Sequence, residues 1–422
     1  MNSNRNIFLF GAGAVRDWGG PKTNDLTETI VKSGFKAKDD QTITSHIYQV
    51  LIDNGYSVNF ETILSVIEEL IIYYSGIKHT SPKNSFHNLF FNQNKITSSF
   101  LNYSINGDVN SNYSLNIPYD EASSSKNARS NKNPDQFFYE LLLINLHTEI
   151  GAKVSKYDFH SLNKQDVIES LDKQELNNNF SKWINKFIGH DEIVRLYTLN
   201  YDRLNKVILE NRGLPVFEGF DSKTIIPYNH KIVPNVKRII EDTDCVCSYN
   251  LHGCSDWKLE ILNNYKNYLP VLKVGTQLAF NYYDYPVFET EHGKPAILTN
   301  IIAGYQKTQR SALIPYKQMQ ASFDRDCLLA DNIFIIGYSF GDEHINESIR
   351  MSLIYNSKLT IHVIDCGFMQ NLELKYFSEF ANLIPNQRPT KVADKIYSYG
   401  NTYAYSYEFG YFLKNEIEYI KR

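Results

Sequence analysis

Residues 6–14 read Asn-Ile-Phe-Leu-Phe-Gly-Ala-Gly-Ala, and this stretch decides the fold. The apolar run from Ile7 to Phe10 stops abruptly at Gly11 and Gly13. A strand of a parallel sheet is covered on both faces and is apolar throughout, and glycines let the chain turn sharply after it. The sequence therefore predicts that the chain opens with a buried parallel strand and a glycine turn.

Further along the chain, apolar runs typical of strands alternate with stretches of helical periodicity. This alternation predicts an α/β protein with a Rossmann-like parallel sheet. The predicted strands span residues 193–198, 246–251, 332–336 and 359–364, and the helices between them include 318–330 and 344–355.

The stretch between the first two predicted strands is mostly helical in pattern, so we expect a large α-helical lobe inserted into the sheet domain. Within it, residues 105–133 are rich in Asn and Ser and predict an exposed loop. The predicted domains are a core of residues 1–35 and 190–375, a helical lobe of 36–189, and an extension of 376–422. We expect the extension to pack on the core or in an oligomer interface.

The composition is that of a globular protein, with 42% hydrophobic and 21% charged residues and a formal net charge of −4. This balance gives no sign of a nucleic-acid or membrane-surface partner. The five cysteines are few and odd in number, which favours a reducing compartment, and the start lacks the pattern of a signal peptide. We therefore expect a cytoplasmic protein.

Four motifs follow predicted strands at their carboxyl ends. Ligands of open parallel sheets bind at these ends, so the motifs predict one composite site. The motifs are Gly11-Ala12-Gly13, Thr198-Leu199-Asn200-Tyr201-Asp202, His252-Gly253 and Gly337-Tyr338-Ser339-Phe340-Gly341-Asp342.

Several of these residues suit a dinucleotide. The glycine turn would let the backbone approach a pyrophosphate, and Arg16, which replaces the last glycine of the dinucleotide fingerprint, would contact a phosphate. Ser339 suits a phosphate or a ribose, and Asp365, at the end of the last predicted strand, suits a ribose hydroxyl. Taken singly, each motif is explained as well by a turn or a helix cap without a ligand.

Three side chains could carry chemistry. The Asn200 amide could bind ribose hydroxyls and orient water, and the Asp202 carboxylate could accept hydrogen bonds from a carboxamide. His252 has the pKa range of a general acid or base. An Asx turn at Asn200 and Asp202 and a structural role for His252 are the alternatives.

A metal site and a nucleic-acid enzyme are both disfavoured. Cys245, Cys247, His252 and Cys254 do not have the spacing of a common structural zinc site, so no zinc is expected. The sequence has neither a cluster of metal-binding carboxylates nor a basic stripe, so we expect no sequence-specific nucleic-acid binding.

The four motifs, in this order, resemble the sirtuin superfamily. The chain is most similar to the sirtuin-like domains of bacterial antiphage defence, which have Asn-Tyr-Asp, as at 200–202, and Asn-Phe-Glu opening a lobe helix, as at 59–61. They also often have Asp-Trp-Gly-x-Pro after the glycine turn, which compares with residues 17–21 here. The zinc knuckle and the Asp-Phe-Arg segment of deacylases are missing, and Val15 replaces a common Ser.

The resemblance implies hydrolysis of NAD to nicotinamide and ADP-ribose, which depletes NAD in infected cells. By position, Asn200 would bind ribose and place the attacking water, Asp202 would hold the nicotinamide carboxamide, and His252 would act at the ribose hydroxyls. Residues implied to hold the dinucleotide are Gly11, Ala12, Gly13, Arg16, Thr198, Gly337, Ser339 and Asp365. A non-catalytic module that binds NAD or ADP-ribose remains the alternative.

A toxic NADase needs control. Roughly 60 residues follow the last predicted strand, which is little for a separate sensor domain. We therefore expect control by homo-oligomerisation or by a separate protein. The resemblance implies a HerA-type ATPase partner or, as the less favoured choice, a short Argonaute.

Overall fold

The computed structural model describes most of the chain. The described residues are 4–35, 41–74, 104–106, 113–116, 129–130, 134–154, 156–157, 171–221, 232–241, 245–261, 268–272, 287–289, 295–297, 299–303, 313–384 and 388–419. They form two compact units, of which the first comprises Met1–Gly20, Val154–Gln277 and Leu313–Arg422 and the second Pro21–Lys153 and Leu278–Ala312.

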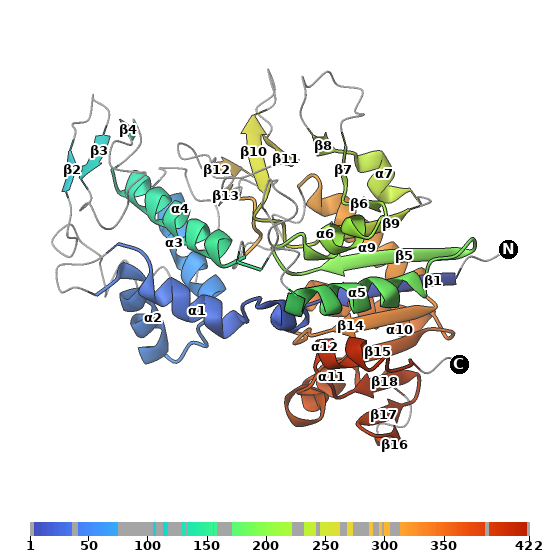
Figure 1. The fold of residues 1–422 in the computed structure, drawn as a ribbon. Helices are drawn as coiled ribbons and strands as arrows, with labels where there is room; N and C mark the ends of the chain where they lie inside the picture. Colours follow the sequence, from blue (N-terminus) through green and yellow to red (C-terminus); the bar gives the residue numbers. More distant parts are fainter. Residues whose placement is uncertain are drawn as a thin grey trace. The chain divides into compact units, whose positions relative to one another are not determined.

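The first unit is built on a mostly parallel sheet that has nine strands among the described residues, in the order β16-β17-β18-β15-β14-β1-β5-β9-β6 (Figure 1). The α/β, Rossmann-like class expected from the sequence is thereby confirmed. The strands are β1 (Asn4–Phe10), β5 (Glu192–Thr198), β6 (Val216–Phe217), β9 (Val246–Asn250), β14 (Asn332–Ile336), β15 (Thr360–Ile364), β16 (Thr390–Ala393), β17 (Ile396–Tyr399) and β18 (Thr402–Tyr405).

Helices cover both faces of this sheet. On one face Phe8 of β1 packs edge-on against Trp183, and on the other Tyr197 of β5 packs against Phe323. The first face carries α5 (Leu171–Asn185), α6 (Leu204–Asn211) and α12 (Phe409–Lys414); the second carries α7 (Val236–Ile240), α9 (Tyr316–Leu329), α10 (Glu343–Tyr355) and α11 (Glu373–Phe380). Shorter elements are η1 (Ala12–Trp18), β7 (Phe220–Asp221), β8 (Val233–Pro234), β10 (Trp257–Ile261), β11 (Tyr268–Leu272) and η4 (Phe368–Leu372).

The sequence did not predict strands β16 to β18. Residues 376–422 were expected as an extension that packs on the core or in an oligomer interface. Their strands join the main sheet, where β18 pairs in parallel with β15. These strands have four residues each, which is too short for their periodicity to be read from sequence. The structure also groups α5 with the sheet, and the expected domain boundaries remain a prediction.

The second unit is mainly helical among the described residues. Its helices are α1 (Thr23–Lys32), α2 (Ile43–Asp53), α3 (Phe60–Tyr74) and α4 (Pro134–Val154), with α1 and α2 both packed on α3. The Asn59 side chain accepts a hydrogen bond from the Thr62 N–H at 3.0 Å, so Asn-Phe-Glu does open a helix. Short strands β12 (Val287–Glu289) and β13 (Pro295–Ile297) complete this unit.

Part of the expected Asn- and Ser-rich loop is not loop. Strands β2 (Ser104–Asn106), β3 (Tyr113–Asn116) and β4 (Arg129–Ser130) pair antiparallel. Backbone N–H and C=O groups pair across strands whatever the side chains are, which a search for apolar periodicity overlooks. The rest of residues 107–133 lies outside the described residues.

A buried charge cluster ties β1 and β5 to α9. The Asp326 carboxylate is fully buried and forms ion pairs with Arg5 of β1 and, at 3.5 Å, with Arg195 of β5. It also accepts a hydrogen bond from the Tyr197 hydroxyl at 2.5 Å, and burial together with this carboxylate raises the pKa of Tyr197. The tyrosine therefore stays protonated and keeps donating. Arg325, the residue before Asp326, also pairs with this carboxylate at 2.8 Å, so four side chains compensate one buried charge.

No helix among the described residues combines the length and apolar character needed to cross a membrane.

The turns after β1 and β14 approach each other closely. A Cβ on Gly337 would lie 2.2 Å from the Ala14 nitrogen and 2.4 Å from the Gly13 carbonyl carbon. Gly337 also has a φ of 58°, which side-chain-bearing residues rarely adopt. Only glycine therefore satisfies both the space and the backbone conformation here.

Replacing Gly337 with Ala should therefore destabilise the protein by about 3 kcal/mol or more, because backbone atoms have to move apart. Urea unfolding of the purified variant measures the loss. Gly341→Ala is the matched control in the same loop, since its Cβ would meet nothing closer than 3.5 Å. Equal stability of the two variants would show that the two turns can accommodate a side chain at Gly337 without cost.

Candidate functional site

Five strands end level at one edge of the sheet. In register, Phe10 of β1 pairs with Thr198 and Ile336, Thr198 pairs with Asn250, and Ile336 pairs with Ile364. All the sequence-predicted motifs follow these residues, and all belong to the first unit. No strand separates β14, β1 and β5, because β1 is the direct neighbour of both β14 and β5. The two glycine turns and the Asn200 motif therefore follow three adjacent strands.

The glycine turns use their amides within the protein. The Gly11 N–H donates to the Ile336 carbonyl and the Gly13 N–H to the Gly337 carbonyl, both at 2.9 Å. These amides hold the two turns together, so their N–H groups are already used within the protein and not directed at phosphate oxygens. The glycines serve to bring the backbones of two neighbouring strand ends into contact.

Asn200 lies at the junction of β1 and β5. Its Nδ2 donates to the Gly11 carbonyl at 3.0 Å, and its backbone N–H donates to the Thr198 hydroxyl at 3.0 Å. The side chain is 8% exposed. The structure thus brings three of the predicted residues, Gly11, Thr198 and Asn200, into one hydrogen-bonded group.

Asp202 is 2% exposed and accepts two hydrogen bonds. Its Oδ1 accepts from the Leu204 N–H at 3.0 Å, which is the Asx turn considered above, and its Oδ2 accepts from the Tyr157 hydroxyl at 2.8 Å. Sequence reasoning missed Tyr157, because no motif surrounds it and the contact joins parts of the chain that lie far apart. A carboxylate oxygen has more than one lone pair, so Asp202 can still accept from a ligand.

The segment that carries Asn200 and Asp202 is held by its backbone. Nδ2 of Asn250, the last residue of β9, donates to the Asn200 carbonyl at 3.1 Å and to the Asp202 carbonyl at 2.6 Å. The Ser255 N–H donates to the Tyr201 carbonyl at 2.9 Å. These bonds fix the loop between β5 and α6 against the loop after β9.

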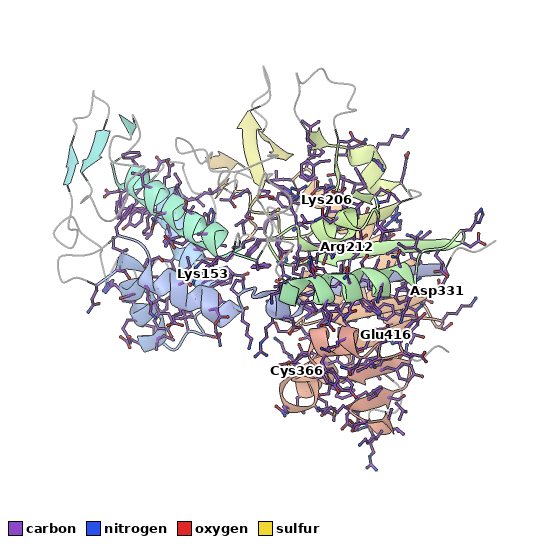
Figure 2. All side chains as sticks on the ribbon, viewed as in Figure 1. Lys153, Lys206, Arg212, Asp331, Cys366 and Glu416 are labelled. Atoms are coloured by element: carbon purple, nitrogen blue, oxygen red, sulfur yellow. The ribbon has the colours of Figure 1, made fainter. Side chains whose placement is uncertain are left out.

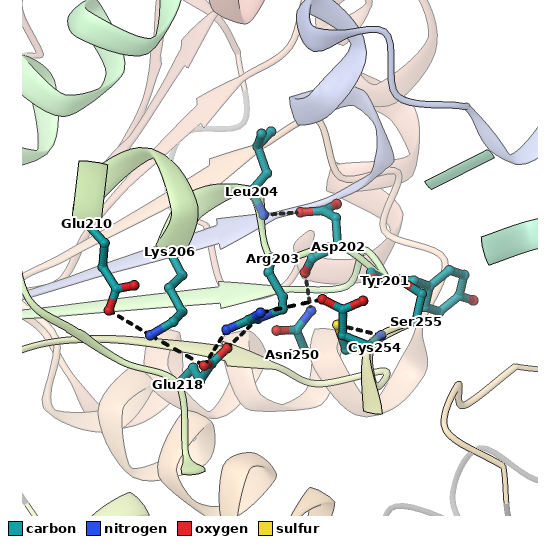
Figure 3. A network of polar contacts seen from close by, with 11 residues as sticks. Tyr201, Asp202, Arg203, Leu204, Lys206, Glu210, Glu218, Asn250, Cys254 and Ser255 are labelled. Carbon is teal, nitrogen blue, oxygen red and sulfur yellow. Dashed lines mark hydrogen bonds and ion pairs between the residues drawn. The ribbon is translucent and has the colours of Figure 1, made fainter. Parts of the chain in front are cut away.

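A charged network anchors the next residue, Arg203 (Figure 3). Its guanidinium binds Glu218 through two hydrogen bonds, at 2.6 and 2.7 Å, and lies 3.5 Å from an Asp256 oxygen. Burial acts to lower the pKa of Arg203, but these carboxylates outweigh burial and raise it above its ordinary value. Lys206 adds a second cation 3.3 Å from Glu218, so the network neutralises most of its own charge.

His252 follows β9 and is 3% exposed. Its Nε2 lies 3.9 Å from an Asp342 carboxylate oxygen, and its ring centroid lies 5.6 Å from that of His344. Asp342 and His344 belong to the loop after β14 and to the start of α10. Asp342 was predicted only as the last residue of a strand-end motif, and His344 was not singled out. A histidine two residues after that acid was the available signal.

The turn that carries Asp342 is rigidly built. Phe340 is buried and has a φ of 54°, an unfavourable value for a side-chain-bearing residue. The Asn346 amide donates to the Phe340 carbonyl at 3.1 Å, and the Tyr338 hydroxyl accepts from the Asp342 N–H at 3.0 Å. Burial raises the pKa of Tyr338, so its hydroxyl remains protonated. Ser339, in the same turn, is exposed.

The remaining predicted residues, Asp365 and Arg16, have partners of their own. Asp365 accepts a hydrogen bond from the Gly367 N–H at 2.7 Å, and exposed Arg16 lies 3.8 Å from a Glu408 oxygen. Cys366, the residue after Asp365, is exposed (Figure 2). Partial burial of its thiol, together with the Asp365 carboxylate, raises the pKa of Cys366. The thiol therefore stays protonated near neutral pH.

Among the described residues, no three His, Cys, Asp or Glu side chains are placed to hold a metal ion.

Comparison with known proteins gives only distant structural likeness. No protein-family model and no curated protein matches the chain. Similar solved structures include a Sir2 homologue in complex with NAD, at 10% identity and a TM-score of 0.36 over 98% of this chain and 88% of that one. A mutant Sir2 homologue in complex with ADP-ribose has 11% identity and a TM-score of 0.35 over 98% and 90%. The fold assignment rests on the sheet topology and not on this likeness.

Arg203→Met should lower the free energy of unfolding by roughly 2 kcal/mol, because it removes one partner of a buried ion pair while Lys206 still offsets part of the Glu218 charge. Urea unfolding measures the loss. Arg212→Met is the control, since the Arg212 side chain donates to the exposed Asn178 side chain in the same region (Figure 2). If the two variants lose the same free energy of unfolding within about 0.5 kcal/mol, the Arg203 network does not stabilise this loop.

Proposed function

We propose that this protein is an NAD glycohydrolase, which converts NAD and water to nicotinamide, ADP-ribose and a proton. The supporting observation is the group of buried polar side chains at level strand ends, with Asn200 and Asp202 after β5 and His252 after β9. Buried polar groups cost stability unless they are compensated, so their concentration at the edge where parallel sheets bind ligands favours a functional reason. The motif order of the sirtuin-like defence proteins points to the same substrate.

In this proposal, each of the three side chains has one role. Asn200 binds the ribose next to nicotinamide and orients water; Asp202 accepts hydrogen bonds from the carboxamide. The water oxygen bonds to the ribose C1′ while the bond from C1′ to the pyridinium nitrogen breaks. The electron pair of the broken bond stays on the nitrogen and neutralises the nicotinamide ring. His252 takes the proton that the water loses and returns it to solvent. The positive charge that develops on the sugar is stabilised by fixed dipoles around it.

The dinucleotide would be held along the same edge. Thr198, Gly337, Ser339 and Asp365 remain proposed contacts for the adenosine and phosphate parts, together with Ala12 in the first turn. Because the Gly11 and Gly13 amides are already bonded, we assign the charge contact with the pyrophosphate to Arg16. Arg16 is exposed and its pairing with Glu408 is long, so exchanging this partner for a phosphate costs little.

The biological role that we propose is depletion of NAD during antiphage defence in the cytoplasm. Control would come from homo-oligomerisation or from a HerA-type ATPase, with a short Argonaute as the less favoured partner. These proposals rest on the sequence motifs.

One observation favours a second function, the binding of NAD or ADP-ribose without turnover. Both Asp202 oxygens already accept hydrogen bonds, from the Leu204 amide and the Tyr157 hydroxyl. If the carboxylate only shapes the loop, the site would bind a nucleotide without engaging the leaving group.

Purified protein, with and without its genomic-neighbour protein, should release nicotinamide and ADP-ribose from NAD, as followed by chromatography. Asn200→Ala and His252→Ala should each lower turnover by about 100-fold or more, because they remove the water-orienting amide and the base.

The matched controls are Asn211→Ala and His190→Ala, which change the same residue types at exposed positions. Full activity in both Asn200→Ala and His252→Ala would contradict the assignment of these residues to the catalytic site. Binding of NAD by calorimetry without any product would favour the second function.

A further inference from the structure

Asp342 sits at a helix N-cap but does not cap the helix. It precedes α10 with an extended backbone, and its side chain makes no capping hydrogen bond. Asp is favoured at this position because its oxygen ordinarily accepts a backbone N–H. Here one carboxylate oxygen lies 3.9 Å from Nε2 of His252, and the side chain is 17% exposed.

The neighbouring chain fixes this placement. Phe340 holds an unfavourable φ of 54°, and its ring is buried 5.2 Å from that of Tyr376. The Tyr338 hydroxyl bonds the Asp342 N–H, and it also donates to Asn346 at 3.0 Å. A strained residue persists only where its surroundings hold it, so the loop presents the Asp342 carboxylate in a set position.

Two groups of the same segment lie near the imidazole of His252. The His344 ring lies 5.6 Å away with an interplanar angle of 41°, and the Asp342 carboxylate faces Nε2. The carboxylate also lies at the start of α10, where the helix dipole favours its negative form. A negative charge beside a buried imidazole stabilises the cation that forms when the ring takes up a proton.

We propose that Asp342 is a positioning residue for His252, an inference that rests on the proposed hydrolase function. The carboxylate keeps the Nε2 proton facing it and so holds the ring in one tautomer. When the ring takes the proton from the attacking water, it becomes a cation and Asp342 balances its charge. A separation of 3.9 Å is longer than a direct hydrogen bond, so the two groups interact by charge or through one water until the ring is charged.

Asp342→Asn should lower kcat for NAD cleavage by about 100-fold and change KM less than threefold, because the side chain acts on the base and not on the substrate. Asn is as good an N-cap as Asp, so the variant should fold normally, which its melting temperature checks. Asp342→Glu, which keeps the charge, should recover part of the lost kcat.

Glu343→Gln is the matched control. It removes one negative charge from the same helix turn, but its side chain is 75% exposed and pairs with Arg350. It should leave kcat unchanged. An unchanged kcat in Asp342→Asn, an effect on KM alone, or an equal loss in Glu343→Gln would overturn the inference while leaving the hydrolase proposal intact.

A measurement without turnover separates the two proposals. In protein carrying ¹⁵N-labelled histidine, the His252 signals are assigned by their loss in His252→Gln. The wild type should show neutral His252 with its proton on Nε2, and Asp342→Asn should shift these signals or mix the tautomers. Unchanged His252 signals would exclude the contact whether or not NAD is cleaved, whereas a wild type that shows the expected signals but no cleavage would refute only the hydrolase proposal.

Discussion

The structure depends on the contact between the turns that follow β1 and β14. Gly13 donates to the Gly337 carbonyl, and a Cβ on Gly337 would overlap the backbone of residues 13 and 14. Because β1 lies between β14 and β5 in the sheet, this contact sets where three strand ends stand relative to one another. Asn200 is placed through the same contact, since its amide binds the carbonyl of Gly11.

Buried polar side chains in the first unit fall into two groups, those that stabilise the fold and those at the strand ends. The charge of Asp326 is compensated by four side chains, and the cluster joins strands β1 and β5 to a helix. The Arg203 network does the same beside the strand-end loop. At the strand ends, by contrast, His252 meets Asp342 at a distance longer than a hydrogen bond and Asp342 leaves its helix uncapped. Such departures from the most stable local arrangement are expected where a protein works on a ligand.

Much of the fold could be predicted because long apolar runs and glycine turns act locally. The runs at 193–198 and 332–336 are strands β5 and β14, and the helix expected at 344–355 is α10. Strands β16 to β18 could not be predicted, because four-residue segments carry too little pattern and gain their stability from pairing with β15. The same limit applies to β2 to β4, which pair through backbone groups in a polar segment.

The sequence by itself determined which residue types stand at the strand ends and in what order, since strand, turn and motif are adjacent in the chain. It therefore sufficed to select Asn200, Asp202 and His252 as candidates. Only the tertiary structure decided that the Gly11 and Gly13 amides are bonded, that Tyr157 donates to Asp202, and that Asp342 faces His252. Each of these contacts joins segments far apart in the chain, and their geometry follows from strand pairing and packing, which local pattern does not encode.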